Sequence, residues 1–504
     1  MNEKYLKIKK LFDLALENYK RNNFLSAKNL YKEILEINPN DVATLNNIGN
    51  VLKESKKYKE AIFYYEKALK IKPRDIITNY NLGLLFRELK KFQKSVSFYE
   101  KVIQIDPKHV QSYHDLMDIY EKTNNYEKLK KIITEAKIFF KNNPIIKLYE
   151  GNLLYKNEKF TEAINSLESF SFEPNKIKQE RFRVATLGKC FDRTKNANKA
   201  FDYFTKANDL SLQLKSNNIS KNFYLKEIEN KLKFFKKFEK GKWPLLEASD
   251  ERPDPIFMIG FPRSGTTLLD TILRSHPLVE VIEEKSMVDK LIYTLNELTE
   301  NNFENLKKID VNQIKKIRKN YFKNLDTHIQ NNNNSKIYID KLPLNIINVG
   351  EIFRIFPKAK FIFSLRHPCD CVISCFMQDF ELNNAMANFL NLEDSARLYD
   401  FVMRLWIQYI SSFPINYHEI RYESLVENLE VTVRSLLKFL KLPWHDSLLE
   451  FYKTAKKREQ IITPSYDQVI KPIYLDASGR WKMYKKQISS TFSILKPWIK
   501  KFNY

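Results

Sequence analysis

Apolar and polar positions in the first part of the chain follow a helical period, and the whole pattern repeats at a fixed distance. Pro39, Pro73 and Pro107 recur every 34 residues, and aromatic and small residues recur in step with them. Such a period predicts stacked helical hairpins, because a single hairpin cannot bury its apolar face alone. Each proline closes a unit, since proline cannot continue the helix before it.

Small residues mark two positions of each predicted hairpin. They stand at the eighth position (Gly49, Gly83, Gly151, Gly188) and at the twentieth (Ala27, Ala61, Ser95, Ala163, Ala200). Small side chains there let the two helices approach closely, and in the clearest copies an aromatic residue four positions later packs one turn on. Four of only 9 glycines occupy the eighth position, which supports this phase.

This pattern resembles the tetratricopeptide repeat, most clearly over residues 8–109. Further copies are expected at 110–143, 144–175 and 181–213, the first with Met117 and Leu129 in place of the small residues. The resemblance implies an all-α solenoid whose concave groove binds a peptide or protein partner. A scaffold that only stabilises and docks the rest of the chain is the alternative.

A change of composition marks the end of the repeats. Residues 214–252 are rich in Lys and Phe and predict a helical linker, which ends in a segment rich in proline and acidic residues. The basic run Lys231–Lys240 is typical of a solvated helix face. The sequence therefore predicts a repeat solenoid at 1–213, a helical linker at 214–252 and a second domain at 253–504.

The second domain opens with a predicted anion-binding loop. A short apolar strand at Ile256–Ile259 is followed by GFPRSGTT and then by the helical pattern LLDTILRSH. A strand, a tight turn with Gly260 and Gly265, and a helix together aim backbone N–H groups and the positive helix end at one anion. The spacing is that of a P-loop, but Thr266 and Thr267 replace the lysine and hydroxyl pair that ATP or GTP hydrolysis needs. Arg263 supplies a planar cation instead, so a kinase or NTPase is the weaker interpretation.

The motif PRSGTTLL, followed by HP and EE, resembles the phosphosulfate loop of sulfotransferases, most closely the tyrosylprotein sulfotransferase branch. These enzymes use 3′-phosphoadenosine-5′-phosphosulfate, and the resemblance implies donor binding by the loop (Pro262, Arg263, Ser264, Gly265, Thr266, Thr267). A second motif, KFIFSLRHPCDCVISCF, contains a predicted strand at 361–365, then Arg366, then Ser374 eight residues later. In the family an Arg and a Ser at this spacing hold the 3′-phosphate, although Asp is more usual where His367 stands.

Two further segments extend the resemblance over residues 254–484. Residues 466–484 resemble the C-terminal segment that covers the cofactor, with Lys471, Arg480 and Lys482 as candidate phosphate contacts, and Tyr422 matches a position near the nucleotide. The implied fold is a P-loop-like, three-layer α/β domain with a mainly parallel sheet. The nucleotide is expected at the carboxyl ends of its strands.

The resemblance also implies the chemistry, which is sulfuryl transfer to an acceptor hydroxyl without a metal. Glu284 is the expected general base, with His276 and His367 as alternatives. Arg263 and Lys341, the latter after a predicted strand at 336–339, are expected to neutralise the leaving phosphate. Peptide tyrosine, sugars and small alcohols all stay open as acceptors. The alternative function is a tetratricopeptide interaction protein whose second domain binds nucleotide without catalysis.

Composition excludes several other classes of protein. The chain has 504 residues, of which 43% are hydrophobic and 29% charged, so it has enough apolar surface for more than one globular core. Its net charge of +24 is spread from end to end; we favour a compositional bias over a basic binding surface and expect no nucleic-acid partner. The 4 cysteines form no disulfide framework, and the trio Cys369, Cys371 and Cys375 lacks a fourth zinc ligand. Without a signal or transmembrane segment, a cytoplasmic protein is expected; the oligomeric state stays open.

Overall fold

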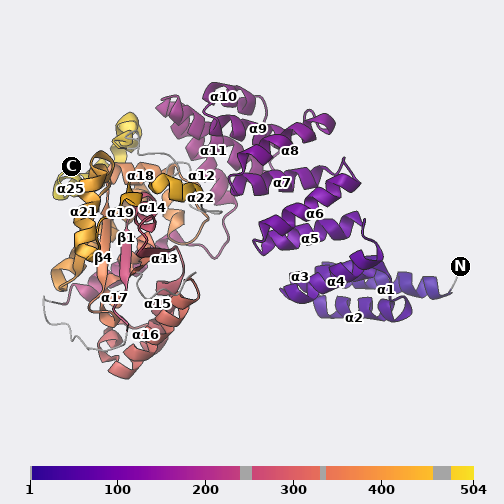
Figure 1. Ribbon diagram of the computed structural model, residues 1–504, viewed down its shortest axis with the longest axis horizontal. Helices are drawn as coiled ribbons and strands as arrows, with labels where there is room; N and C mark the ends of the chain where they lie inside the picture. Colours follow the sequence, from indigo (N-terminus) through magenta and orange to yellow (C-terminus); the bar gives the residue numbers. More distant parts are fainter. Residues whose placement is uncertain (1–2, 239–251, 330–336, 458–477) are drawn as a thin grey trace. The chain divides into compact units, whose positions relative to one another are not determined.

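The chain forms two compact units, Met1–Ser171 and Phe172–Tyr504. The computed structural model describes residues 3–238, 252–329, 337–457 and 478–504, and Figure 1 traces both units along the sequence. Each unit is described by itself. Lys471 and most of the segment 466–484 lie outside the described residues.

The first unit consists of helical hairpins, as the repeat predicts. Its helices are α1 Glu3–Lys20, α2 Phe24–Ile37, α3 Val42–Glu54, α4 Tyr58–Ile71, α5 Ile76–Glu88, α6 Phe92–Ile105, α7 Val110–Lys122, α8 Tyr126–Phe139, α9 Pro144–Lys156 and α10 Phe160–Glu168. The turn inside each hairpin contains one non-glycine residue with positive φ (Asn22, Lys56, Lys90, Asn124 and Glu158). This recurring turn confirms the periodic array, including the copy at 110–143.

Each glycine at the eighth repeat position lies under a large side chain of the partner helix. A Cβ built on Gly49 would stand 2.5 Å from the ring of Tyr65, and one on Gly83 would stand 2.5 Å from the ring of Tyr99. A real Cβ does not approach a ring this closely, so the ring fits there only because glycine has no side chain. The small residue and the aromatic residue sixteen positions later therefore act as one packing pair.

The copy with Met117 shows the same space filled in the opposite way. Met117 is buried at the glycine position, and the aromatic residue opposite it is replaced by the smaller Ile133, which is also buried. A longer side chain on one helix thus accompanies a shorter one on its partner. Core volume is conserved across the repeats, which is the condition under which core substitutions are tolerated.

The second unit begins with three helices and continues into an α/β domain. The helices are α11 Ile177–Arg193, α12 Ala197–Gln213 and α13 Lys221–Phe235. The strands are β1 Ile256–Gly260, β2 Val279–Glu283, β3 Ile337–Lys341, β4 Lys360–Leu365 and β5 Asn416–Arg421. The remaining α-helices are α14 Thr266–Arg274, α15 Met287–Leu298, α16 Val311–Asp326, α17 Val349–Ile355, α18 Pro368–Phe376, α19 Leu392–Ser412, α20 Tyr422–Glu427, α21 Leu429–Leu440, α22 Phe451–Lys457, α24 Lys485–Ile488 and α25 Phe492–Lys501. Short 3-10 helices are η1 Phe303–Lys308, η2 Pro343–Asn348, η3 Met386–Leu390, η4 Asp446–Leu448, η5 Arg480–Tyr484 and η6 Ser489–Thr491.

The five strands form one sheet in the order β2-β3-β1-β4-β5, with each neighbouring pair parallel. Successive side chains point to opposite faces of the sheet. Those of the central strands β1 and β4 are almost all buried, which requires helices on both faces. Met258 and Ile339 join a core with α14 and α21, whereas the ring of Phe363 lies 4.7 Å from that of Trp406 on α19. This confirms the predicted three-layer α/β fold with a parallel sheet.

The described part of the basic run Lys231–Lys240 is only partly the solvated surface that the sequence predicted: Lys233, Lys236 and Lys237 are exposed, but the opposite face is buried. Lys231 is buried, and its ammonium lies 2.7 Å from Glu351 and also contacts Asn348. Phe235 on the same helix packs 5.0 Å from the ring of Tyr409 on α19. The prediction therefore holds for one face only, because the phenylalanines and Lys231 of the same run pack on the α/β core. The structure thus groups α11, α12 and α13 with the sheet.

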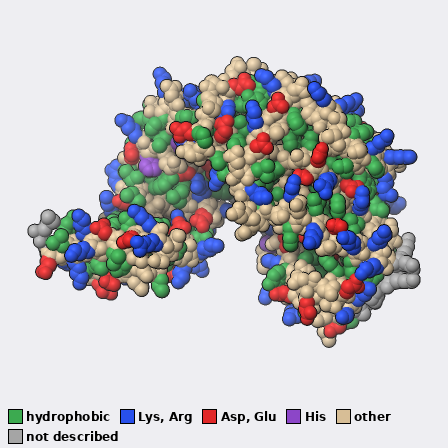
Figure 2. Space-filling model, turned by 180° about the vertical axis from the view of Figure 1, so that it is seen from behind, with side chains coloured by type: hydrophobic (Ala, Val, Ile, Leu, Met, Phe, Trp, Pro, Cys, Tyr) green, Lys and Arg blue, Asp and Glu red, His purple; other side chains and the backbone are tan. Residues whose placement is uncertain are grey.

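The surface bears on the two interpretations of the high positive charge. Lys and Arg side chains are scattered among acidic and uncharged ones over the face shown in Figure 2, without gathering in one continuous patch. Many of the described lysines pair with a nearby carboxylate, as Lys122 does with Asp118 at 2.9 Å. This distribution favours a compositional bias over a dedicated polyanion surface.

The packing pair can be tested by introducing the residue types of Met117 and Ile133 at the equivalent positions of another repeat, Gly83 and Tyr99. We expect Gly83→Met to destabilise the first unit by about 1–3 kcal/mol through overpacking against Tyr99. The double variant Gly83→Met/Tyr99→Ile should recover part of that loss, as measured by calorimetric unfolding of the full chain in a double-mutant cycle. Losses that simply add would show that the two positions do not share one space.

Candidate active site

The loop after β1 forms an open cradle at the beginning of α14. Arg263 and Gly265 both have positive φ, 69° and 95°, which turns the chain sharply from the strand into the helix. The residues described provide no side-chain cap for the N-terminus of α14. The buried Oγ of Ser264 also has no hydrogen-bond partner among them. Free amide groups, a positive helix end and a free hydroxyl favour an anion as the ligand.

Three predicted donor-binding residues meet at this loop from three different elements. The guanidinium of Arg366, after β4, donates to the backbone oxygen of Arg263 at 3.0 Å, and Arg263 Nε donates to Ser374 Oγ of α18 at 3.0 Å. The ring of Tyr422, at the start of α20, lies 4.6 Å from the Arg366 guanidinium and packs directly on Gly265. The two arginines are therefore neighbours rather than separate features.

Sheet topology explains why these residues meet. After β1 the chain continues to β2 on one side, and after β4 it continues to β5 on the other side. The carboxyl ends of two such adjacent strands leave a crevice between their outgoing connections, where ligands bind in open α/β sheets. Arg263 and Arg366 stand at this crevice.

The described part of the C-terminal segment is fastened beside the crevice. Asp370 in the first turn of α18 accepts hydrogen bonds from the backbone of Gly479 and Trp481, both at 2.8 Å. Arg480 forms a two-point ion pair with Asp192 of α11, at 2.9 Å for Nε. The structure thus pairs Arg480 with this carboxylate, whereas the sequence predicted a contact with the donor phosphate. Lys471, another of the three predicted basic contacts, lies outside the described residues.

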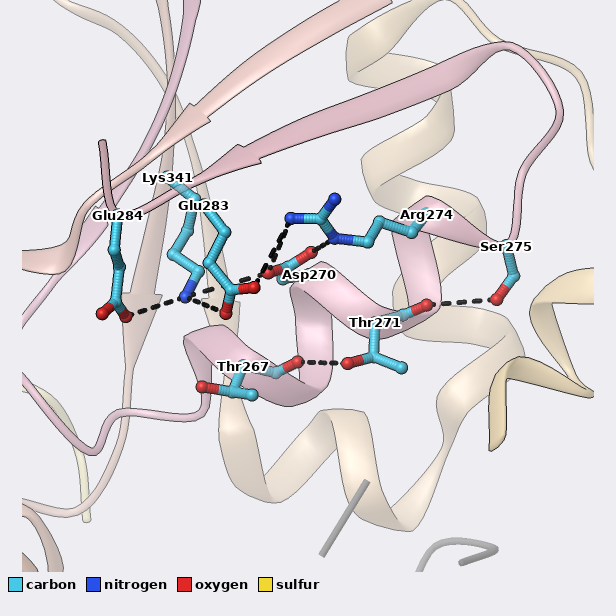
Figure 3. A network of polar contacts seen from close by, with 8 residues as sticks. All are labelled: Thr267, Asp270, Thr271, Arg274, Ser275, Glu283, Glu284 and Lys341. Atoms are coloured by element: carbon cyan, nitrogen blue, oxygen red, sulfur yellow. Dashed lines mark hydrogen bonds and ion pairs between the residues drawn. The ribbon is translucent and has the colours of Figure 1, made fainter. Parts of the chain in front are cut away.

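A charged cluster lies beside the cradle, on the α14 face of the sheet (Figure 3). The ammonium of Lys341 contacts Glu283 and Glu284, each at 3.0 Å, and lies 3.8 Å from Asp270 on α14. Arg274 also pairs with Asp270 and lies 3.7 Å from the second carboxylate oxygen of Glu283. Lys341 is the last residue of β3 rather than a residue after the strand, so the sheet itself fixes its direction.

Burial and charge act against each other inside this cluster. Burial lowers the pKa of Lys341, but Asp270, Glu283 and Glu284 more than offset this, and the net shift is upward. Burial raises the pKa of Asp270. The Lys341 side chain is 0% exposed and that of Glu283 14%, whereas that of Glu284 is 45% exposed. Glu284 is thus the member of the cluster that an incoming molecule reaches most easily.

Both histidines that could replace Glu284 as the base are held by packing and hydrogen bonds. His276 is buried, with Nε2 at 2.9 Å from the Pro443 oxygen and Nδ1 accepting from Leu278 N–H at 3.1 Å. His367 stacks on Trp481 at 4.9 Å, and burial lowers its pKa to about 4. Both nitrogens of the first ring are engaged and the second is a weak base, so neither is well suited to take a proton at neutral pH.

The cysteine trio of α18 is buried against the two strand-end loops. The thiol of Cys375 donates to the oxygen of Pro262 at 3.4 Å, and burial raises the pKa of Cys369 to about 12. These thiols therefore stay protonated and pack as apolar groups. Within the described ranges, no group of three or more His, Cys, Asp or Glu side chains is arranged to hold a metal ion.

Sequence reasoning missed Asp270, Arg274 and the anchoring carboxylates Asp192 and Asp370. The first two form an acid–base pair four residues apart on α14, a spacing that does signal neighbours on one helix face. No comparable signal marks Asp192, because it lies far along the chain from Arg480.

Comparisons with known proteins agree with the geometry. Residues 255–446 match the model of the sulfotransferase family, and residues 42–75 and 77–109 each match a tetratricopeptide repeat model. The second unit carries a sulfotransferase-family domain. Tetratricopeptide repeats precede it, as the sequence predicted.

The relatives match parts of the chain and are distant. An uncharacterized protein of Aquifex aeolicus is 29% identical over 353 residues, 68% of this chain and 44% of that protein. The protein-tyrosine sulfotransferase of Drosophila melanogaster is 26% identical over 240 residues, 45% of this chain and 46% of that protein. The human protein-tyrosine sulfotransferase 1 is 23% identical over 269 residues, 49% of this chain and 69% of that protein. The chain thus spans about half the length of the first two relatives.

Solved structures are also similar in part. One, titled "Functional Characterization of Pseudomonas Aeruginosa pilF", has a TM-score of 0.36 at 18% identity and covers 42% of this chain and 94% of that one. In the parts of the chain that the structure describes, no helix has the length and apolarity to span a membrane.

The cradle makes Gly265 a sensitive position. Gly265→Ala should be destabilising for two reasons: a left-handed conformation costs about 1–2 kcal/mol for a residue with a Cβ, and the new methyl would stand 2.5 Å from Tyr422. Gly479→Ala is the matched control, because Gly479 also has positive φ but its nearest neighbour is 3.6 Å away. Urea unfolding should show the larger loss for Gly265→Ala; equal losses would mean that Tyr422 does not seal the loop.

Proposed function

We propose that this protein is a sulfotransferase that moves a sulfuryl group from 3′-phosphoadenosine-5′-phosphosulfate to an acceptor hydroxyl. The observation that carries the proposal is the meeting of Arg263, Arg366 and Ser374 at the sheet crevice, beside a cluster that joins Lys341 to Glu284. Such a site offers cations at two places and one exposed carboxylate. The uncapped start of α14 and the free Ser264 hydroxyl fit a donor with more than one anionic group.

The donor supplies the sulfuryl group and, as the leaving group, a 5′-phosphate. Arg366 and Ser374 would hold its 3′-phosphate through charge-assisted hydrogen bonds, while the loop amides and the hydroxyls of Thr266 and Thr267 would hold the 5′ end. In this arrangement Tyr422 keeps the Arg366 guanidinium in place through its ring. Pro262 and Gly265 shape the loop rather than contact the anion through side chains.

The chain's own residues then account for the proton and the developing charge. Glu284 takes the proton of the acceptor hydroxyl as its oxygen bonds to sulfur and the bond from sulfur to the phosphate oxygen breaks. Lys341 and Arg263 offset the negative charge that collects on the departing phosphate. Because Lys341 touches Glu284 directly, the site of proton removal and the site of charge neutralisation are linked by one ammonium group.

Peptide tyrosine is the acceptor that the relatives favour, since several of them are named protein-tyrosine sulfotransferases. The tetratricopeptide repeats would bind a peptide or protein partner and so bring acceptors to the domain. Sugars and small alcohols are the other acceptors to include. A catalytically inactive nucleotide-binding protein is the second candidate, and the assay separates it: donor binding without transfer to a broad acceptor panel, read by mass spectrometry, would favour it.

Donor binding should depend on Arg366. We expect Arg366→Ala to weaken the binding of 3′-phosphoadenosine-5′-phosphate about 30-fold, the loss of about 2 kcal/mol for a hydrogen-bonded charge. Isothermal calorimetry measures it. Arg421→Ala is the matched control, because Arg421 lies at the carboxyl end of the neighbouring strand β5 but contacts Tyr504 and the Phe502 oxygen instead. Equal affinities of Arg366→Ala and wild type would contradict the proposed donor site.

The role of Glu284 can be tested with acceptors of different acidity. Glu284→Ala should leave donor binding within about threefold but lower transfer to a tyrosyl peptide about 10²–10⁴-fold, the usual contribution of a general base. Transfer to p-nitrophenol, which is roughly half ionised near neutral pH, should fall much less because its phenolate needs no base. The control is Glu297→Ala, an exposed glutamate on α15. If both acceptors lost activity equally, Glu284 would have a role other than proton removal.

A further inference from the structure

The pair Asp270 and Arg274 on α14 has no part in the chemistry proposed above, yet it lies inside the charged cluster. Both residues are carried by the helix whose first turn forms the anion cradle (Figure 3). Asp270 is fully buried in the second turn, and the Arg274 side chain is 19% exposed. Burial of a carboxylate lowers the stability of the fold unless the charge is paired. The partners of Asp270 therefore indicate what it does beside the cradle.

Asp270 contacts both cations of the cluster. One of its oxygens pairs with Nε of Arg274, and the other lies 3.8 Å from the Lys341 ammonium. It therefore connects α14, which forms the donor cradle, with β3, which carries the lysine. This contact ties the position of the lysine to the same helix that would hold the phosphate.

Arg274 acts on the other side of the cluster, on Glu283. One carboxylate oxygen of Glu283 accepts from Lys341 at 3.0 Å, and the other lies 3.7 Å from Arg274. Both oxygens of Glu283 thus face a cation. Glu284 meets Lys341 with a single oxygen and is far more exposed, so the two consecutive glutamates are not equivalent.

We propose, on the basis of the proposed sulfotransferase function, that Asp270 and Arg274 are positioning residues: Asp270 holds the Lys341 ammonium at the donor cradle, and Arg274 occupies Glu283 so that Glu284 alone accepts the proton. The counting of charges agrees. Three carboxylates face two cations, and the remaining negative charge resides on the exposed Glu284.

The two residues have opposite effects on how firmly Lys341 keeps its proton. The charged groups around its ammonium are Asp270 and Arg274 from α14 and Glu283 and Glu284 from the end of β2, while the facing residue of β1 is the apolar Met258. Asp270 favours the protonated amine, so its loss lowers the pKa of Lys341. Arg274 is a cation in the same cluster, so its loss raises that pKa.

The experiment compares Asp270→Asn and Arg274→Gln with wild type by two independent readouts. Calorimetry of 3′-phosphoadenosine-5′-phosphate binding from about pH 8 to about pH 12, a range that extends above the ordinary pKa of lysine because that of Lys341 is raised, reports the charge of Lys341. For Asp270→Asn the pH above which affinity falls should move down, and for Arg274→Gln it should move up. Near pH 8 Asp270→Asn should bind the nucleotide within about threefold of wild type, or more tightly, since a negative charge has been removed.

Turnover of a tyrosyl peptide supplies the second readout. Asp270→Asn should lower kcat at least about tenfold while the KM for donor changes little, the pattern expected when positioning of the lysine is lost after binding. Arg274→Gln should lower kcat by less. Asp254→Asn is the matched control, because it also removes a buried carboxylate from an arginine, Arg318, at 2.8 Å; it should lower stability without moving either pH profile or kcat.

The outcomes separate this inference from the proposed function. If neither variant moves the pH profile, or both move it in the same direction, the positioning role is overturned, and Arg274→Gln decides this even if Asp270→Asn does not fold. If wild type binds the nucleotide but transfers no sulfate, the proposed function fails while the opposite shifts still support the positioning role. Unchanged kcat in a folded Asp270→Asn would contradict it.

Discussion

The site depends on one feature of the sheet, the point between β1 and β4 at which the strand order reverses. The chain leaves β1 toward β2 and leaves β4 toward β5, so the loops after these adjacent strands are forced apart above a shared crevice. Side chains that follow the two strands must then meet there, whatever their distance in sequence. Arg263 and Arg366 are brought together by the order of strands rather than by any direct attraction, since like charges repel. Ser374 and the Arg263 carbonyl oxygen accept hydrogen bonds from these guanidinium groups and hold them in place.

A second theme is how the protein keeps charged groups buried without neutralising them. Lys341 stays charged at 0% exposure because three carboxylates surround it, and Lys231 is paired in the same manner with Glu351. Such pairs contribute little net stability, but removal of one partner is strongly destabilising. They are therefore retained most readily where the direction of a charge matters, as it does for a lysine beside an anion cradle.

Much of this organisation is readable in the sequence because local rules carry it. The 34-residue period identifies the hairpins, and the strand, GFPRSGTT and helix order identifies the cradle, since both depend on residues close together in the chain. The positions of Lys341 and Arg480 could not be derived in this way. The sequence placed Lys341 after a strand, whereas the strand continues to include it, and nothing local connects Arg480 with Asp192. Lys231 was misjudged for the same reason: its buried partner Glu351 is 120 residues away.

The repeat at 110–143 likewise shows where a pattern of single positions fails. Its Met117 departs from the small-residue rule, yet the hairpin forms because Ile133 is correspondingly smaller. A pattern that scores positions one at a time cannot register such compensation, because it is a property of two facing positions together.

The attachment of α11 to the C-terminal segment has a consequence for how such proteins arise. Asp192 holds Arg480 and Tyr484, and α13 fills the core beside α19. An exchange of repeat arrays between genes would need to join the chains ahead of α11, since a junction after α11 would remove Asp192 from Arg480, and one after α13 would also leave Glu351 buried without its lysine. The sheet and its three leading helices would therefore be exchanged as one piece.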